Sequence, residues 1–157
     1  MANIAIEVVL LAPLLVIQII LLPFVANTMW AKWANTTRDV MLKETASQMA
    51  STIQQLYLSL NRQEISTGII TQASTLPAEI AECSYYATGS LKASLQHGFG
   101  KILFLNLTLQ ELGNTVTVQT PLGTNVLWND TSVFDSSSPN ASIKVQKFTN
   151  GTLLFSF

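Results

Sequence analysis

The hydrophobic pattern of the chain changes twice along its length. Residues 4–25, IAIEVVLLAPLLVIQIILLPFV, are almost continuously apolar. Beyond Ser66 apolar and polar residues alternate, which is typical of strands. Between these two regions, apolar and small residues recur every three or four positions and form the stripe of an amphipathic helix; they are Leu42, Ala46, Met49, Ile53, Leu56 and Leu60. The pattern predicts an α+β protein in which a long N-terminal helix precedes a β domain.

A single helix can cover the first two patterns. No glycine or proline occurs between Val25 and Asn61, so one helix can run from about Ile4 to Asn61, roughly 90 Å at about 1.5 Å per residue. We predict an apolar part (1–26), an amphipathic part (27–62) and a β domain (63–157). The alternative is a membrane anchor followed by a separate amphipathic helix. Pro13 and Pro23 are expected to loosen the helix locally, because each removes one backbone hydrogen bond.

The apolar part has the length of a membrane span. A helix over residues 4–25 is about 33 Å long, close to the thickness of the hydrocarbon core. Trp30 and Trp33 follow it, and aromatic residues favour the membrane–water interface. Lys32 and Arg38 also follow the span, and the positive-inside rule would place the C-terminal side in the cytoplasm.

Glycosylation motifs argue for the opposite orientation. The chain contains five Asn-x-Ser/Thr motifs, at Asn35, Asn106, Asn129, Asn140 and Asn150. Such motifs are used on the outer side of a membrane. Only 11% of the residues are charged, so attached sugar would help a hydroxyl-rich surface stay soluble. We therefore expect covalent N-linked glycans and an outward-facing domain. The conflict disappears if a short basic leader has been removed, or if orientation is set in another way.

Alternating leucines define the clearest strand. In KILFLNLTLQ, residues 101–110, the leucines share one face and Asn106 lies on the other. The pair Asn150-Gly151 is favoured in two-residue turns and predicts a hairpin at the C-terminal end. The polar residues 130–142 are predicted to form a loop. Further strands are predicted at residues 68–72, 85–94, 114–120, 126–128, 142–148 and 152–157. Short strands at regular spacing indicate an antiparallel β-sandwich.

The sequence shows no arrangement of residues typical of an enzyme. It has no G-x-S-x-G motif, no Gly-rich phosphate loop and no paired cysteines. The one cysteine, Cys83, is expected to be a small buried side chain, and His97 has no ligand cluster around it. Glu79 and Glu82 are interpreted as a solvated pair. The net charge is −1, so nucleic acid is not an expected partner. We expect a structural protein without catalytic residues, metal or cofactor.

Two stretches of the chain resemble pilins. AIEVVLLAPLLVIQII, residues 5–20, resembles the N-terminus of TadE-like pilins, which place a glutamate six residues before a proline, here Glu7 and Pro13. ASQMASTIQQLYLSLNRQEI, residues 46–65, is similar to the upper helix of archaeal pilin-like proteins. Taken with the glycosylation motifs and the β domain, the chain looks most like an archaeal type IV pilin or its relative, the archaellin.

This resemblance implies a function and a set of partners. A prepilin peptidase would remove a basic leader, and subunits would leave the membrane through an assembly machinery. The mature chains would stack their helices into a homopolymeric extracellular filament used for adhesion. The residues expected to form the polymerisation helix are Glu7, Leu10, Pro13, Leu14, Ile17, Ile20, Leu21 and Phe24. In many pilins the glutamate is the fifth mature residue, whereas here it is the seventh residue of the chain.

Two questions stay open at this point. Glu7 could pair with the N-terminal amine of a neighbouring subunit, because a buried charge needs a partner, or it could lie at the level of the lipid headgroups. The chain could also be an archaellum subunit, a minor pilin or a single-span surface glycoprotein. A tethered module usually has a flexible Pro/Gly/Ser-rich stalk. The unbroken helix predicted here favours the filament.

Overall fold

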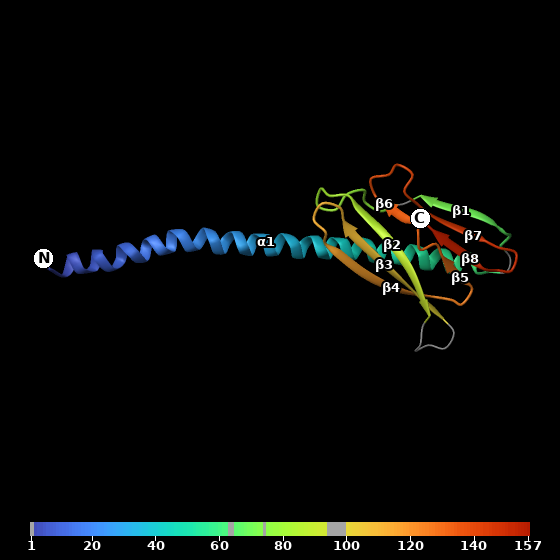
Figure 1. Ribbon diagram of the computed structural model, residues 1–157, viewed down its shortest axis with the longest axis horizontal. Helices are drawn as coiled ribbons and strands as arrows, with labels where there is room; N and C mark the ends of the chain where they lie inside the picture. Colours follow the sequence, from blue (N-terminus) through green and yellow to red (C-terminus); the bar gives the residue numbers. More distant parts are fainter. Residues whose placement is uncertain (1, 63–64, 74, 94–99) are drawn as a thin grey trace. The chain divides into compact units, whose positions relative to one another are not determined.

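The chain consists of two compact units. A computed structural model describes residues 2–62, 65–73, 75–93 and 100–157, and the side chains of residues 2–10 and 12 are not among those described. His97 therefore lies outside the described residues. Contacts divide the chain into Met1–Thr37 and Arg38–Phe157, and each unit is described by itself. One helix, α1 (Ala2–Leu60), contributes to both units and contains Pro13 and Pro23 (Figure 1). The predicted long helix is confirmed.

The second unit contains two four-stranded sheets (Figure 1). The first sheet has the order β1 (Gly68–Ala73), β7 (Ser142–Lys147), β8 (Leu153–Ser156) and β5 (Val126–Trp128). The second has the order β4 (Thr115–Leu122), β3 (Lys101–Leu109), β2 (Tyr85–Ala93) and β6 (Val133–Asp135). Neighbouring strands are antiparallel except β5 and β8, which are parallel. The predicted α+β fold is confirmed, with this one parallel pair as an addition.

The helix and both sheets share one hydrophobic core. The predicted stripe of α1 is buried, since Leu42, Ala46, Met49 and Ile53 are fully shielded from solvent, and Leu56 packs at its edge. The inward leucines of β3 are also fully buried, and Val145 of the first sheet belongs to the same cluster. Full burial of such a side chain stabilises a protein by about 1.5–3 kcal/mol. The amphipathic part of α1 is therefore the central element of the domain.

Two local predictions were wrong. Residues 130–142 were predicted to form a loop, but Val133–Asp135 forms β6 and pairs with β2. Phe134 explains this difference, because it is buried and its ring lies 6.1 Å from the ring of Tyr85. The C-terminal hairpin is confirmed, but its loop has three residues rather than two. Phe148 N–H donates to the Thr152 carbonyl at 2.9 Å, and Gly151 takes the left-handed conformation (φ 78°) typical of three-residue hairpin loops.

Candidate functional site

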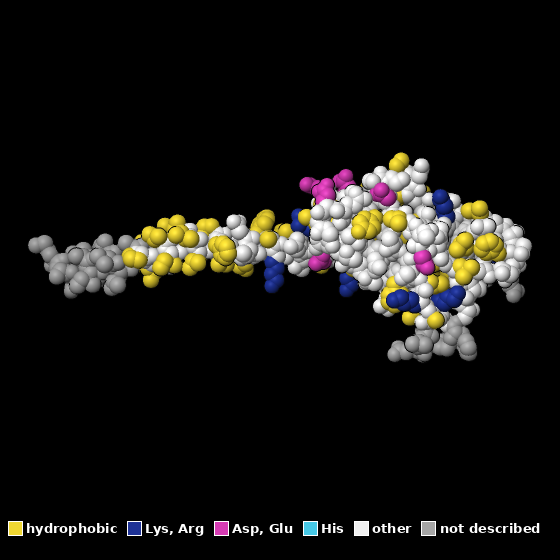
Figure 2. Space-filling view, in the orientation of Figure 1, with side chains coloured by type: hydrophobic (Ala, Val, Ile, Leu, Met, Phe, Trp, Pro, Cys, Tyr) yellow, Lys and Arg dark blue, Asp and Glu magenta, His cyan; other side chains and the backbone are white. Residues whose placement is uncertain are grey.

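The apolar part of α1 is exposed on every side within its unit. The large apolar side chains described between residues 11 and 25 are 47–69% exposed. Four consecutive members, Ile19, Ile20, Leu21 and Leu22, cover more than one full helical turn, so no face is shielded. Figure 2 shows apolar side chains along both edges of this part of the helix. Burying the exposed halves of roughly ten such side chains would contribute on the order of 10 kcal/mol.

The residues predicted to form the polymerisation helix all lie on α1. Leu14, Ile17, Ile20, Leu21 and Phe24 are exposed, as is Pro13, so each is accessible to a partner or to lipid. Glu7 and Leu10 belong to the helix by their backbone, but their side chains lie outside the described residues. By length and composition, α1 is apolar enough to cross a membrane.

An aromatic and hydroxyl-rich band follows the apolar segment. Trp30 and Trp33 are 70% and 62% exposed, with ring centroids 5.6 Å apart. The hydroxyl groups of Thr28 and Thr36 donate to helix carbonyls three or four residues earlier, at 2.8 and 2.9 Å. Both hydroxyl groups already donate hydrogen bonds within the helix. The band can therefore enter a weakly polar environment without leaving either hydroxyl donor unpaired. The band suits a lipid headgroup region or a protein interface.

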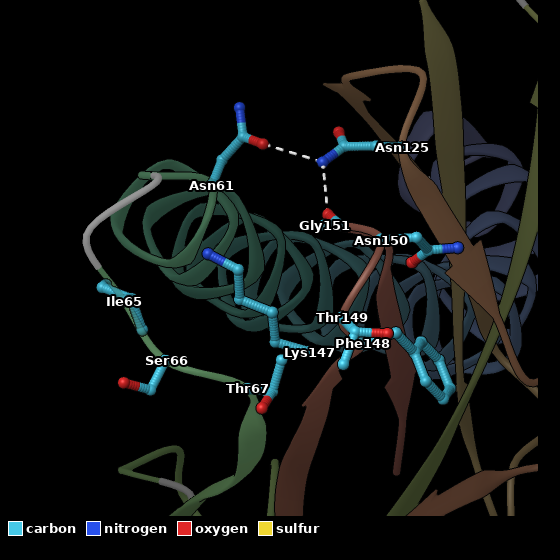
Figure 3. A pocket seen from close by; sticks show the side chains of 10 residues that line it. All are labelled: Asn61, Ile65, Ser66, Thr67, Asn125, Lys147, Phe148, Thr149, Asn150 and Gly151. Carbon is cyan, nitrogen blue, oxygen red and sulfur yellow. Dashed lines mark hydrogen bonds between the residues drawn. The ribbon is translucent and has the colours of Figure 1, made fainter.

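Asn129 and Asn150 lie in turns and share one local geometry. Asn129 Oδ1 accepts hydrogen bonds from Thr131 N–H and from the Thr131 hydroxyl, at 3.2 and 2.7 Å. Asn150 Oδ1 accepts a hydrogen bond from Thr152 N–H at 3.0 Å. In both motifs the third residue therefore holds the amide oxygen in an Asx-turn. In Figure 3 the amide nitrogen of Asn150 points away from Lys147. Both side chains are exposed and present the atom to which a sugar would be attached.

The other three motifs differ in setting. Asn140 is exposed in the segment before β7. Asn35 is exposed on α1 in the first unit. Asn106 lies on the outer face of β3, as predicted, but it is half-buried and accepts a hydrogen bond from the Thr117 hydroxyl of β4 at 2.7 Å. The hydroxyl of its motif, Thr108, is bonded to that of Thr115 at 2.9 Å. The hydrogen bond from β4 thus holds the Asn106 side chain against the face of the sheet, whereas the asparagines of the loop motifs are exposed.

A polar groove of about 530 Å³ lies beside the C-terminal end of α1 (Figure 3). Lys147 of β7 donates hydrogen bonds from Nζ to the carbonyls of Leu60 and Arg62, at 2.8 and 2.7 Å. A cation at this position satisfies orphan carbonyls and interacts favourably with the helix dipole. Asn125 Nδ2 donates to Asn61 Oδ1 and to the Gly151 carbonyl, at 2.8 and 2.9 Å. Sequence reasoning missed this cap, because no local pattern links residues 87 positions apart.

The pKa values of two side chains in the second unit are shifted by their surroundings. Burial raises the pKa of Tyr85 to about 12, and its hydroxyl donates to the Pro77 carbonyl at 2.9 Å. Hydrogen bonds from the Ser137 hydroxyl and N–H lower the pKa of Asp135. Cys83 is buried, and Glu79 and Glu82 are exposed, as predicted.

No protein-family model matches the chain, and it matches no curated protein and no solved structure.

Proposed function

We propose that the protein is a structural subunit that polymerises through α1 into an extracellular helical filament of the archaeal type IV pilus class, used for surface attachment. The observation that carries this proposal is the exposed apolar segment at residues 11–25, which belongs to the same helix as the core stripe of the domain. An isolated chain in water would leave this surface uncovered on all sides. Packing against copies of the same helix would bury it and display the domains outward.

The same segment can serve two environments in succession. Before assembly it would span the membrane, with Trp30 and Trp33 at the interface. In the filament, apolar contacts between copies would replace the contacts with lipid, so the helix needs no change of composition. A prepilin peptidase and a membrane assembly machinery are the partners of this scheme. Glu7 would then pair with the N-terminal amine of a neighbouring copy, because a buried charge needs a partner.

The glycosylation motifs fit an outward-facing domain. Asn129, Asn140 and Asn150 are exposed and would carry sugar without disturbing the core. An archaellum subunit would use the same design for swimming. The second candidate is a minor pilin or a surface glycoprotein anchored by a single span. The exposed Trp pair beside a membrane-length segment favours this candidate, because it suits a chain that stays in the bilayer.

Filaments sheared from the source cells and viewed by negative-stain electron microscopy test the proposal. N-terminal sequencing of the filament protein, whose polypeptide mass is 17.1 kDa before sugar is added, would establish whether those filaments contain this chain. We expect thin filaments built from it. Finding the chain only in the membrane fraction, with no filaments, would favour the anchored glycoprotein instead.

A paired variant separates the role of α1 from general damage. Replacing Leu14 and Ile17 by Asp should abolish filaments, because two charges would enter the apolar core without partners. The control replaces Thr71 of β1 and Gln119 of β4, two exposed residues on different sheets, by Asp. Normal filament numbers from the Leu14→Asp, Ile17→Asp chain would refute the core-helix role.

A further inference from the structure

Exposed carboxylates gather at one end of the second unit. Asn114, in the turn between β3 and β4, donates a hydrogen bond to Asp39 Oδ1 at 2.7 Å. In the same turn, Gln110 N–H donates to the Ser84 carbonyl at 3.0 Å, beside the tight turn that carries Glu82. We call this region the carboxylate end; its members are Asp39, Glu44, Glu79, Glu82 and Glu111, all exposed. A group of carboxylates is visible at the upper left of the domain in Figure 2.

The carboxylate end contains a groove of about 250 Å³. Glu44 of α1 and Glu79 line it together with the apolar side chains of Met41, Pro77 and Ile80. Both carboxylates are exposed. Arg38 and Lys43 are on the same stretch of α1, so negative charge is in excess but not exclusive. The groove therefore offers apolar contact and exposed carboxylates at the same place.

Among the described residues, basic side chains gather at the opposite end of the unit. In the β2–β3 ladder, Tyr85 pairs with Leu109 at the carboxylate end, and Ala93 pairs with Lys101 at the opposite end. Eight residue steps along a strand separate the two by about 26 Å. Lys101 Nζ donates to the Val126 carbonyl, and Lys147 caps the C-terminal end of α1. We call this region the basic end; its members are Arg62, Lys92, Lys101 and Lys147.

We infer that the carboxylate end of one domain docks against the basic end of a second copy, so that domains associate head to tail. The inference deepens the proposed function and rests on it. A contact between two different surfaces of the same chain is heterologous, and heterologous contacts that do not close into a ring produce open helical polymers. Charge complementarity identifies the occupant, because exposed carboxylates outnumber basic side chains at one end, whereas Arg62 and Lys92 are exposed at the other.

The expected role of this contact is orientation rather than affinity. A single exposed ion pair contributes about 0–1 kcal/mol. Complementary charged surfaces nevertheless steer encounter and suppress wrong registers, since like charges placed opposite one another repel. Domains meeting with two carboxylate ends together would be disfavoured.

A charge-swap experiment in cells producing the full chain tests the inference. One variant carries Glu79→Lys and Glu82→Lys, the second carries Arg62→Glu and Lys92→Glu, and the third carries all four changes. Filaments are counted by electron microscopy, and near-ultraviolet circular dichroism of detergent-extracted protein checks the fold. The matched control is Lys144→Glu, which reverses an exposed lysine on β7 outside the basic end.

Each outcome has a defined meaning. We expect filament numbers to fall at least tenfold in either paired variant and to recover in the four-change variant, with the control unchanged. Normal filaments from a paired variant, or no recovery in a folded four-change variant, would overturn the inference while leaving the proposed function intact. A wild-type chain that forms no filaments would refute the proposed function itself. If a reversed pair prevents folding, Glu79→Gln with Glu82→Gln replaces it, and a drop of about threefold is expected; no drop would count against the inference.

Discussion

Gly89 provides a test in which two physical effects predict opposite signs. The residue is buried in the middle of β2, where it pairs with Leu105 of β3. On backbone grounds alone, Gly89→Ala should stabilise the domain by about 0.5–1 kcal/mol, because glycine loses more conformational freedom on folding. In the structure, however, a Cβ atom at this position would overlap three atoms of the Trp128 indole. Packing therefore predicts destabilisation.

The indole of Trp128 has little room to move away. It is 8% exposed, lies parallel to the Phe155 ring at 6.2 Å and meets the Phe157 ring edge-on at 5.1 Å. Its Nε1 has no hydrogen-bond partner among the described residues, so packing alone fixes the ring. Overpacking a core costs about 1–3 kcal/mol. Because three indole atoms would be overlapped, the cost lies in the upper part of this range, and after subtraction of the backbone gain we expect a net loss of about 1–2 kcal/mol.

Thermal unfolding of the full chain in detergent, followed by differential scanning calorimetry, measures this effect. A loss of this size lowers the Tm by roughly 3–12 °C for a domain of this length. Gly68→Ala is the matched control, because a Cβ there meets no atom within 4 Å and should be neutral or slightly stabilising. Gly89→Ala combined with Trp128→Phe should recover part of the loss by removing the overlapping ring. A Gly89→Ala chain as stable as the wild type would refute the packing of Trp128 on β2.

Three further predictions concern the helix cap, a buried tyrosine and the sugars. Lys147→Met should destabilise the domain by about 1 kcal/mol in chemical unfolding, because two helix carbonyls lose a charged donor, while Lys144→Met should change little. The pKa of Tyr85 is higher in the folded than in the unfolded protein, so the contribution of Tyr85 to stability is complete below pH 10 and is lost as the pH rises toward 12. The wild-type chain should therefore have a lower unfolding midpoint at pH 11 than at pH 9, and this difference should be smaller in Tyr85→Phe. Mass spectrometry should find sugar on peptides containing Asn129 or Asn150, and bare peptides at both positions would contradict the Asx-turn argument.

The sequence predicted those elements whose pattern is set by burial on one face. The stripe from Leu42 to Leu60 and the alternation from Leu103 to Leu109 both face the core, because periods of 3.6 and 2 each place their apolar residues on one side. β6 was missed because its three residues lie in a serine-rich stretch, and only Phe134 marks it. The parallel pairing of β5 with β8 left no local trace, since it joins strands separated by 24 residues that no turn connects.

The same distinction between local pattern and distant contacts applies to the candidate sites. The exposed apolar segment could be predicted from the sequence, because it is apolar on all sides of the helix and its composition alone reveals it. The cap by Lys147 and the separation of charge between the carboxylate end and the basic end were not visible. Each depends on residues far apart in the chain that the β ladders bring together. The segments that carry Glu82 and Glu111, for example, are joined by the pairing of Tyr85 with Leu109 and by the hydrogen bond from Gln110 N–H to the Ser84 carbonyl.

In the proposed filament, the apolar segment of α1 and the charged ends of the domain would have different roles. Burial of the apolar segment would contribute on the order of 10 kcal/mol, but the hydrophobic effect is non-directional, and an evenly apolar helix can slide or turn against its copies with little penalty. Charges at the two ends of a domain contribute little energy but distinguish one register from the next. The helix would therefore supply most of the association energy, and the domain would determine the register of the subunits. Asp substitutions at Leu14 and Ile17 should remove filaments whatever the ionic strength, whereas the loss caused by Glu79→Lys with Glu82→Lys should diminish as salt screens the charges. Equal salt dependence of the two defects would contradict this division of roles.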